Sequence, residues 1–259
     1  MKYIEFKSTG SYALISLNRP DKYNSFIREM ALEMQEALDI CEKDENIRAV
    51  LISANGKAFS AGQDLKEITD WSHTKELETI ISEHYNPIIL RLTTMEKPIV
   101  CAVKGVAAGA GANIALACDI VIASESASFI QAFSKIGLIP DSGGTWILPR
   151  LIGLQRAKAL IMLGEKISAT EAAQMGMIYK TYPDDRLEEE AKNMTAKLAK
   201  MPTRGLGLSK RALNLSLNNS LNDQLIHEWR LQAEAGSTDD FREGVSAFLE
   251  KRKPEFKGK

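Results

Sequence analysis

Residues 99–113 read IVCAVKGVAAGAGAN, an apolar run that passes into a turn of small residues and then into an alanine-rich stretch. Two other segments resemble its first half, RAVLIS at 48–53 and DIVIA at 119–123. Continuous β-branched runs separated by helical stretches are typical of strands buried on both faces of a parallel sheet. These three segments therefore predict an α/β core.

The flanking sequence extends this prediction in both directions. Before the core, apolar patterning predicts strands over 3–7 and 12–17 and a helix over 25–43. After about residue 140 the strand signal fades and helices are expected. They span 155–163, 187–200, 221–235 and 241–251. We therefore expect an α/β core over residues 1–200 and a helical C-terminal region over 201–259.

The composition narrows the class of protein. Thirty-three basic and 34 acidic residues give a net charge of −1, whereas binders of nucleic acid or membrane surfaces need a basic excess. No stretch reaches the ~18 apolar residues of a membrane span, and the N-terminus lacks the apolar region of a signal peptide. The three cysteines have no metal-ligand spacing. We expect a cytoplasmic protein with reduced thiols, no metal, and neither nucleic acid nor membrane as a partner.

A second turn of small residues occurs at 58–65, AFSAGQDL, after a predicted strand. The backbone N–H groups of such a turn suit an anion, although a tight strand-to-helix connection explains this stretch equally well. The turn at 105–113 is not a dinucleotide fingerprint, because Ile114 replaces the third glycine. Two such turns together predict an oxyanion hole, in which two N–H donors stabilise negative charge that develops on one oxygen.

Asp141 lies in a third notable segment, IGLIPDSGGTW at 136–146. An aspartate in a loop rich in Pro and Gly is most often an Asx turn or a helix N-cap, and from the residue alone the cap is favoured. The alternative is a carboxylate in an apolar cleft, where a raised pKa would suit proton transfer.

Together these segments resemble the crotonase (enoyl-CoA hydratase/isomerase) superfamily, from LNRP at 17–20 to EGVSAFLEKR at 243–252. Within it, AFSKIGLIPD at 132–141 is most similar to the 1,2-epoxyphenylacetyl-CoA isomerases of phenylacetate degradation. The resemblance implies repeated ββα units followed by C-terminal helices that mediate trimerisation. It also implies a homotrimer or a hexamer made of two trimers, an acyl-CoA thioester as the substrate and no separate cofactor.

The resemblance further implies which residues form the site. The N–H groups of Gln63 and Ala110 would hold the thioester oxygen, and Asp141 becomes the predicted catalytic group. The other residues expected at the substrate are Ala61, Gly62, Asp64, Lys66, Gly109, Phe133, Phe248 and Lys251. Trp71 and Tyr85 are further candidates for the acyl pocket, beside Phe133.

Two departures from the family pattern decide the predicted reaction. Hydratases use two glutamates to activate water, and this chain has Asn113 and Phe133 at those positions, neither of which is a general base. We therefore predict an isomerase in which Asp141 removes a proton near the carbonyl and returns one further along the acyl group. The substrate would be a 3-enoyl-CoA, an epoxidised phenylacetyl-CoA, or both.

Three alternatives remain open. An enoyl-CoA hydratase of fatty-acid oxidation would need another base, and His73, His84 and His227 fit surface or packing roles better. A dehalogenase-like hydrolase would use Asp141 as a nucleophile. A relative without catalysis would only bind acyl-CoA or RNA.

Overall fold

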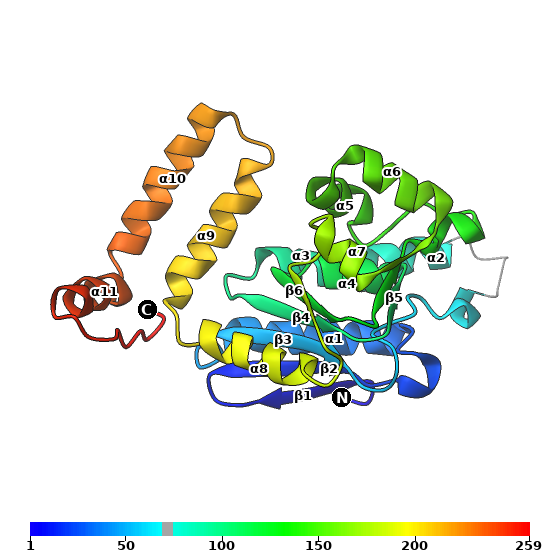
Figure 1. Cartoon of the computed structure of the whole chain (residues 1–259), viewed down its shortest axis with the longest axis horizontal. Coiled ribbons are helices and arrows are strands. Elements are labelled where there is room, and N and C mark those ends of the chain that lie inside the picture. The colour runs from blue at the N-terminus through cyan, green and yellow to red at the C-terminus, as the bar shows by residue number, and fades with distance from the viewer. Residues whose placement is uncertain (69–74) are drawn as a thin grey trace.

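A six-stranded sheet forms the centre of the core in the computed structural model, which describes residues 1–68 and 75–259 (Figure 1). Its strands, in spatial order, are β1 (Ile4–Ser8), β2 (Tyr12–Leu17), β3 (Ala49–Ala54), β4 (Ile99–Val103), β6 (Ile120–Ser124) and β9 (Lys180–Tyr182). Apart from the antiparallel β1–β2 pair, neighbouring strands are parallel. The strands predicted before residue 130 are thus confirmed to within one residue at each end.

A second sheet of three strands escaped prediction. β5 (Val106–Ala108) pairs in parallel with β7 (Ser128–Ile130), which pairs antiparallel with β8 (Lys166–Ser168). Each of these strands has only three residues, too few to show a pattern of alternation. The expectation that strands end near residue 140 is wrong, because β8 and β9 both lie beyond it.

The two faces of the central sheet pack against different helices. Along β3, Val50 and Ile52 belong to the larger apolar cluster and Leu51 to the smaller one, as the alternation of side chains requires. Helix α1 (Arg28–Lys43) contributes to the larger cluster, whereas α8 (Leu187–Leu198) packs on β3, β4 and β6 and contributes to the smaller. Burial on both faces explains why these strands are continuous apolar runs.

The other helical segments connect these layers and carry the loops of the site. They are η1 (Pro20–Lys22), η2 (Leu65–Ile68), α2 (Lys75–Thr79), the π-helix η3 (Ile80–Tyr85), α3 (Asn86–Thr94), α4 (Ala110–Leu116), η4 (Ala132–Ile136), α5 (Gly144–Ile152), α6 (Leu154–Leu163) and α7 (Ala169–Gln174).

Three helices, α9 (Thr203–Ser216), α10 (Leu221–Gly236) and α11 (Asp239–Leu249), project from the core (Figure 1). Arg48, at the start of the β3 segment, ties them to it. Its guanidinium donates to the Met201 carbonyl (2.5 Å), the Phe256 carbonyl (2.7 Å) and the Thr203 hydroxyl (2.9 Å). The expected boundary at residue 200 falls between α8 and α9.

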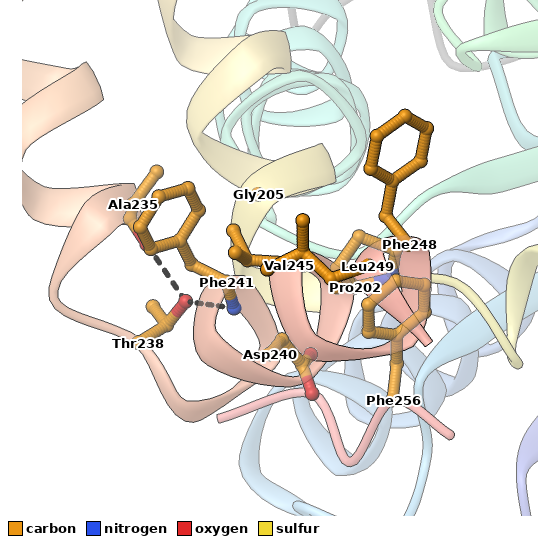
Figure 2. A pocket seen from close by; sticks show the side chains of 11 residues that line it. Pro202, Gly205, Ala235, Thr238, Asp240, Phe241, Val245, Phe248, Leu249 and Phe256 are labelled. Carbon is orange, nitrogen blue, oxygen red and sulfur yellow. Dashed lines mark hydrogen bonds between the residues drawn. The ribbon is translucent and has the colours of Figure 1, made fainter. Parts of the chain in front are cut away.

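An apolar cavity of ≈ 450 Å³ lies between these C-terminal helices (Figure 2). Thr238 begins α11 beside it: its hydroxyl accepts from the Phe241 N–H (3.1 Å) and donates to the Ala235 carbonyl (2.7 Å). In Figure 2 the ring of Phe248 points away from that of Phe256, and the residue is 83% exposed. Phe248 is therefore not packed within its own chain.

Candidate active site

The two turns of small residues lie against each other at one edge of the core. Ser60 pairs with Ala107: its N–H donates to the Val106 carbonyl (3.2 Å), and its carbonyl accepts from the Ala108 N–H (2.9 Å). On the other side, the Phe26 N–H donates to the Gly62 carbonyl (2.7 Å). The segment around Gly62 is thus held by two backbone neighbours.

Gly62 sets the distance between the two turns. Its φ is +86°, and a β-carbon at this position would lie 2.9 Å from the Ala108 carbonyl oxygen and 3.5 Å from the Ala110 nitrogen. Only glycine permits both this conformation and this approach. Gln63 therefore directly follows a residue that packs against the turn containing Ala110.

The N–H groups of Gln63 and Ala110 both remain available to a ligand. Ala110 is the first residue of α4, and the first N–H groups of a helix have no intrahelical acceptor. Within residues 1–68 and 75–259, the Gln63 N–H makes no hydrogen bond to another residue. Gly109, with φ +52°, turns the chain into the helix, and the ring of buried Phe133 lies 3.8 Å from where its β-carbon would be. Phe133 therefore borders the turn.

Asp141 lies just before α5, with its carbonyl and its carboxyl both engaged. The carbonyl accepts from the Asn113 side chain (2.9 Å) and from the Gly144 N–H (2.8 Å), and carboxyl Oδ1 accepts from the Ser142 hydroxyl (2.9 Å). Burial raises the pKa of the Asp141 carboxyl, and the hydrogen bond from Ser142 opposes that shift only in part. A carboxyl with this bias is suited to exchange protons with a bound molecule.

The interpretation of Asp141 as the cap of α5 is wrong. Gly143 occupies the N-cap position, with φ +73°, and no side chain makes a capping hydrogen bond there. Ser142 before it is also left-handed, with φ +51°. These two positive φ values separate Asp141 from the helix, so its carboxyl does not reach the N–H groups of the first turn.

A side-chain network joins the first turn to the π-helix. The Tyr85 hydroxyl donates to Gln63 Oε1 (2.6 Å), and Gln63 Nε2 donates to Glu67 Oε2 (2.8 Å). Tyr85 is buried, and burial together with the negative charges of Asp141 and Glu67 raises its pKa. Tyr85 was predicted only as a residue of the acyl pocket, and Glu67 was not predicted at all, because their contacts depend on the path of a loop.

Asp64 takes a structural position beside the site. Its carboxyl pairs with Arg19 Nη1 (2.8 Å) and accepts from the Lys66 N–H (3.2 Å). Burial opposes the charged form, but the hydrogen bonds from Arg19 and Lys66 leave the pKa of Asp64 lowered. Ala61 and Lys66 lie on the exposed surface of the same loop.

One chain does not bring every predicted residue to this site. Phe248 is on α11 and Lys251 just beyond it, at the far end of the C-terminal region from α4 and α5 in Figure 1. Trp71 and His73 lie outside the described residues. His84 is buried within the π-helix, where burial lowers its pKa, as a packing role predicts.

The described residues contain neither a metal-binding cluster nor a membrane-spanning helix. No group of three or more His, Cys, Asp or Glu residues in that part of the chain could hold a metal ion. Among the helices of residues 1–68 and 75–259, none combines the length and apolar character that a bilayer crossing requires. Cys41, Cys101 and Cys118 are free and buried, and burial raises the pKa of Cys41 to about 12.

Comparison with known proteins identifies close relatives. Residues 7–259 match the family model described as enoyl-CoA hydratase/isomerase. The chain is 47% identical over 247 residues to 1,2-epoxyphenylacetyl-CoA isomerase of Escherichia coli (strain K12), covering 95% of this chain and 94% of that one. It is 43% identical to the "Probable enoyl-CoA hydratase" of Rhodobacter capsulatus, covering 99% and 98%. The crystal structure of enoyl-CoA hydratase from Bacillus anthracis superposes with a TM-score of 0.94 at 34% identity, covering 99% and 100%.

Proposed function

The chain belongs to the enoyl-CoA hydratase/isomerase family and has its α/β crotonase fold; from this premise we propose that it is an acyl-CoA isomerase with Asp141 as its proton shuttle. One observation carries the proposal. Asp141 is a carboxyl whose burial raises its pKa, and the two positions at which hydratases hold glutamates are Asn113 and Phe133.

The first step of the proposed mechanism is polarisation of the thioester. The N–H groups of Gln63 and Ala110 would donate to the thioester oxygen, and the charge that grows there during proton removal would strengthen both hydrogen bonds. Removing one donor of such a pair typically costs about 3 kcal/mol of barrier. The close packing of Gly62 against Ala108 and Ala110 supports this role, because it fixes the two donors before substrate binds.

The second step is movement of a proton by Asp141. The ionised carboxyl would take the proton next to the thioester carbonyl, and the protonated form would return it two carbons further on, so that a 3,4 double bond becomes a 2,3 double bond. One carboxyl suffices because the proton that leaves is the proton that returns. The raised pKa of Asp141 favours both halves of this exchange.

An aromatic substrate is proposed alongside the aliphatic one. The Escherichia coli relative is named for an epoxidised phenylacetyl thioester, and that substrate also needs a polarised thioester and no added water. Phe133, whose ring lies beside Gly109, is an apolar neighbour suited to a ring-bearing acyl group.

We propose that the chain assembles as a homotrimer or as a dimer of trimers. Phe248 is exposed and lies far from the chain's own turns, and α9 and α10 carry further exposed apolar residues. These include Leu213, Leu221, Leu225 and Trp229. A neighbouring subunit would cover these faces, and Phe248 and Lys251 would then reach coenzyme A in an adjacent site. Light scattering on the purified protein tests this, and a monomer would contradict it.

Product analysis with two substrates tests the proposed reaction. Incubation with a 3-enoyl-CoA should yield the 2-enoyl isomer at unchanged mass, while 2-enoyl-CoA should gain little water. The variant Asp141→Asn should lose about 10²-fold or more of the isomerase kcat. Asp119→Asn is the matched control, because Asp119 is also a carboxyl whose burial raises its pKa, but it pairs with Lys210 (2.9 Å) away from the site. Rapid hydration of 2-enoyl-CoA, or full activity of Asp141→Asn, would overturn the proposal.

A further inference from the structure

Asn113 is buried on α4, only 1% exposed, and its side chain bridges two other segments. Nδ2 donates to the Asp141 carbonyl (2.9 Å), and Oδ1 accepts from Gln131 Nε2 (2.9 Å). The orientation of the amide is dictated by chemistry, since a carbonyl can only accept and must therefore face the NH₂ group. That in turn places the amide oxygen of Asn113 opposite a donor from Gln131.

Asn113 lies directly against the start of α5. A β-carbon on Gly144 would lie 2.3 Å from Asn113 Nδ2, so the side chain fills the space beside the first turn of α5. Gly144 also donates its N–H to the Asp141 carbonyl. The backbone of Asp141 is thus held by two donors, one from each helix, and its carboxyl projects from that fixed point.

Gln131 completes the arrangement at a cost in free energy. It is 3% exposed, and its Oε1 has no hydrogen-bond partner among the described residues. A buried oxygen without a partner costs roughly 1–3 kcal/mol. Gln131 Oε1 remains without a partner, whereas Gln131 Nε2 donates to Asn113 and orients it.

We propose that Asn113, aligned by Gln131, is a positioning residue that fixes the direction of the Asp141 carboxyl toward the acyl group. This inference rests on the proposed role of Asp141. It gives a positioning role to residue 113, the position at which hydratases have a catalytic glutamate. In this chain Asn113 holds the backbone of Asp141, the proposed proton-transferring residue, and does not activate a water molecule.

Two variants of Asn113 separate positioning from general stability. Asn113→Ala removes both hydrogen bonds, and a misplacement of about 1 Å costs up to 10²-fold. We expect kcat to fall about 10- to 100-fold while KM for 3-enoyl-CoA stays within about threefold, measured well below the Tm. Thr195→Val is the matched control: Thr195 is buried and donates to the Ala191 carbonyl on α8, on the other face of the sheet, and its loss should lower Tm without changing kcat.

Asn113→Asp adds a readout that a purely structural role would not move. When protonated, the new carboxyl can donate to the Asp141 carbonyl and accept from Gln131. When ionised, it opposes the same carbonyl. The ratio of its kcat to that of the wild type should therefore rise as pH falls, whereas the ratio for Asn113→Ala should stay flat. Asp141, whose carbonyl accepts from Asn113, is titratable, and so is Tyr85, whose pKa the charge of Asp141 helps to raise; both are present in the variant and in the wild type.

The activities of the Asp141 and Asn113 variants distinguish failure of the positioning role from failure of the proposed function. If Asp141→Asn is inactive but both Asn113 variants keep kcat within threefold at every pH, the positioning role is wrong and the proposed function stands. If Asp141→Asn is active, both fail together. Gln131→Met, which keeps the volume and removes the donor to Asn113, should reproduce a smaller loss, about 3- to 10-fold in kcat. Full activity of that variant would overturn the part assigned to Gln131.

Discussion

Replacing Gly62 with alanine tests the geometry of the paired turns directly. The added β-carbon would sit 2.9 Å from the Ala108 carbonyl oxygen, a contact closer than real β-carbons make, so one of the two turns must shift by a few tenths of an ångström. Because Gln63 follows directly, its N–H shifts relative to that of Ala110. The two N–H groups of the proposed oxyanion hole would then no longer point at the same thioester oxygen.

Two effects of the Gly62→Ala substitution can be estimated separately. Alanine at φ +86° costs about 1–3 kcal/mol of folding free energy, a penalty that acts on stability. Misalignment of one oxyanion donor costs up to about 3 kcal/mol of barrier, or about 10²-fold in kcat. KM should change much less, because the hydrogen bonds are stronger in the transition state than in the bound substrate.

Gly10→Ala is the control that isolates the second effect. Gly10 has φ +91° but no atom within 4 Å of its missing β-carbon, and it lies in the turn between β1 and β2. It should lose similar stability and keep full activity. Both variants would be compared by thermal unfolding and by isomerisation of 3-enoyl-CoA. If Gly62→Ala retains kcat within threefold of Gly10→Ala, the two turns do not form the hole.

Burial and the hydrogen bonds lead to four further predictions. Burial raises the pKa of Asp141 above its ordinary 3.8, so the contribution of this carboxyl to the unfolding free energy should fall as pH rises from 3.8 through the raised native value. In calorimetry, Asp141→Asn should therefore melt higher than the wild type above that window and at the same temperature below 3.8. For the same reason kcat of the wild type should rise with pH through the raised pKa. Arg48→Ala should cost about 2–4 kcal/mol and expose α9 to hydrogen exchange before the core, because it removes three hydrogen bonds to residues 201, 203 and 256. The three cysteines should resist iodoacetamide in the folded protein and react fully in guanidinium chloride, since burial raises the pKa of Cys41 to about 12 and all three are buried.

The sequence predicted those elements whose own residues determine them. β4 was placed without error, because an apolar run buried on both faces has few alternatives. Helix α1 begins at Arg28, three residues later than expected, because Phe26 pairs with the Gly62–Gln63 segment and stays extended. That pairing is a long-range contact, which local periodicity does not contain.

Helix α9 shows a different limit of local reasoning. Gly205 and Gly207 weaken its helical signal, and although residues 201–259 were predicted to be helical, no helix range was given there. In the fold, a β-carbon on Gly207 would lie 2.4 Å from the Glu96 carbonyl oxygen, so glycine is required for the helix to pack against that segment. The packing of α9 against the Glu96 segment, and not helix propensity, explains why residue 207 is a glycine.

The candidate site was predictable where it is made of backbone and unpredictable where it is made of side-chain partners. The turns containing Gln63 and Ala110 could be recognised because two turns of small residues each follow a predicted strand. The link from Tyr85 through Gln63 to Glu67 could not, since the first two of these residues lie 22 positions apart. Asp141 was assigned correctly to its loop, but the residue alone favoured a cap, because two successive left-handed residues are not visible in the sequence.

The contact between Asn113 and Gly144 has an evolutionary consequence. A glutamate at position 113 is longer by one methylene, and Asn113 already lies against the start of α5, the helix that follows the Asp141 loop. We therefore expect acquisition of the hydratase residue to shift α5 and, with it, the loop of Asp141, the proposed proton-transferring group. Mutational paths from one reaction to the other should pass through variants poor at both, and selection for hydration should recover changes at the α4–α5 junction before any at position 113.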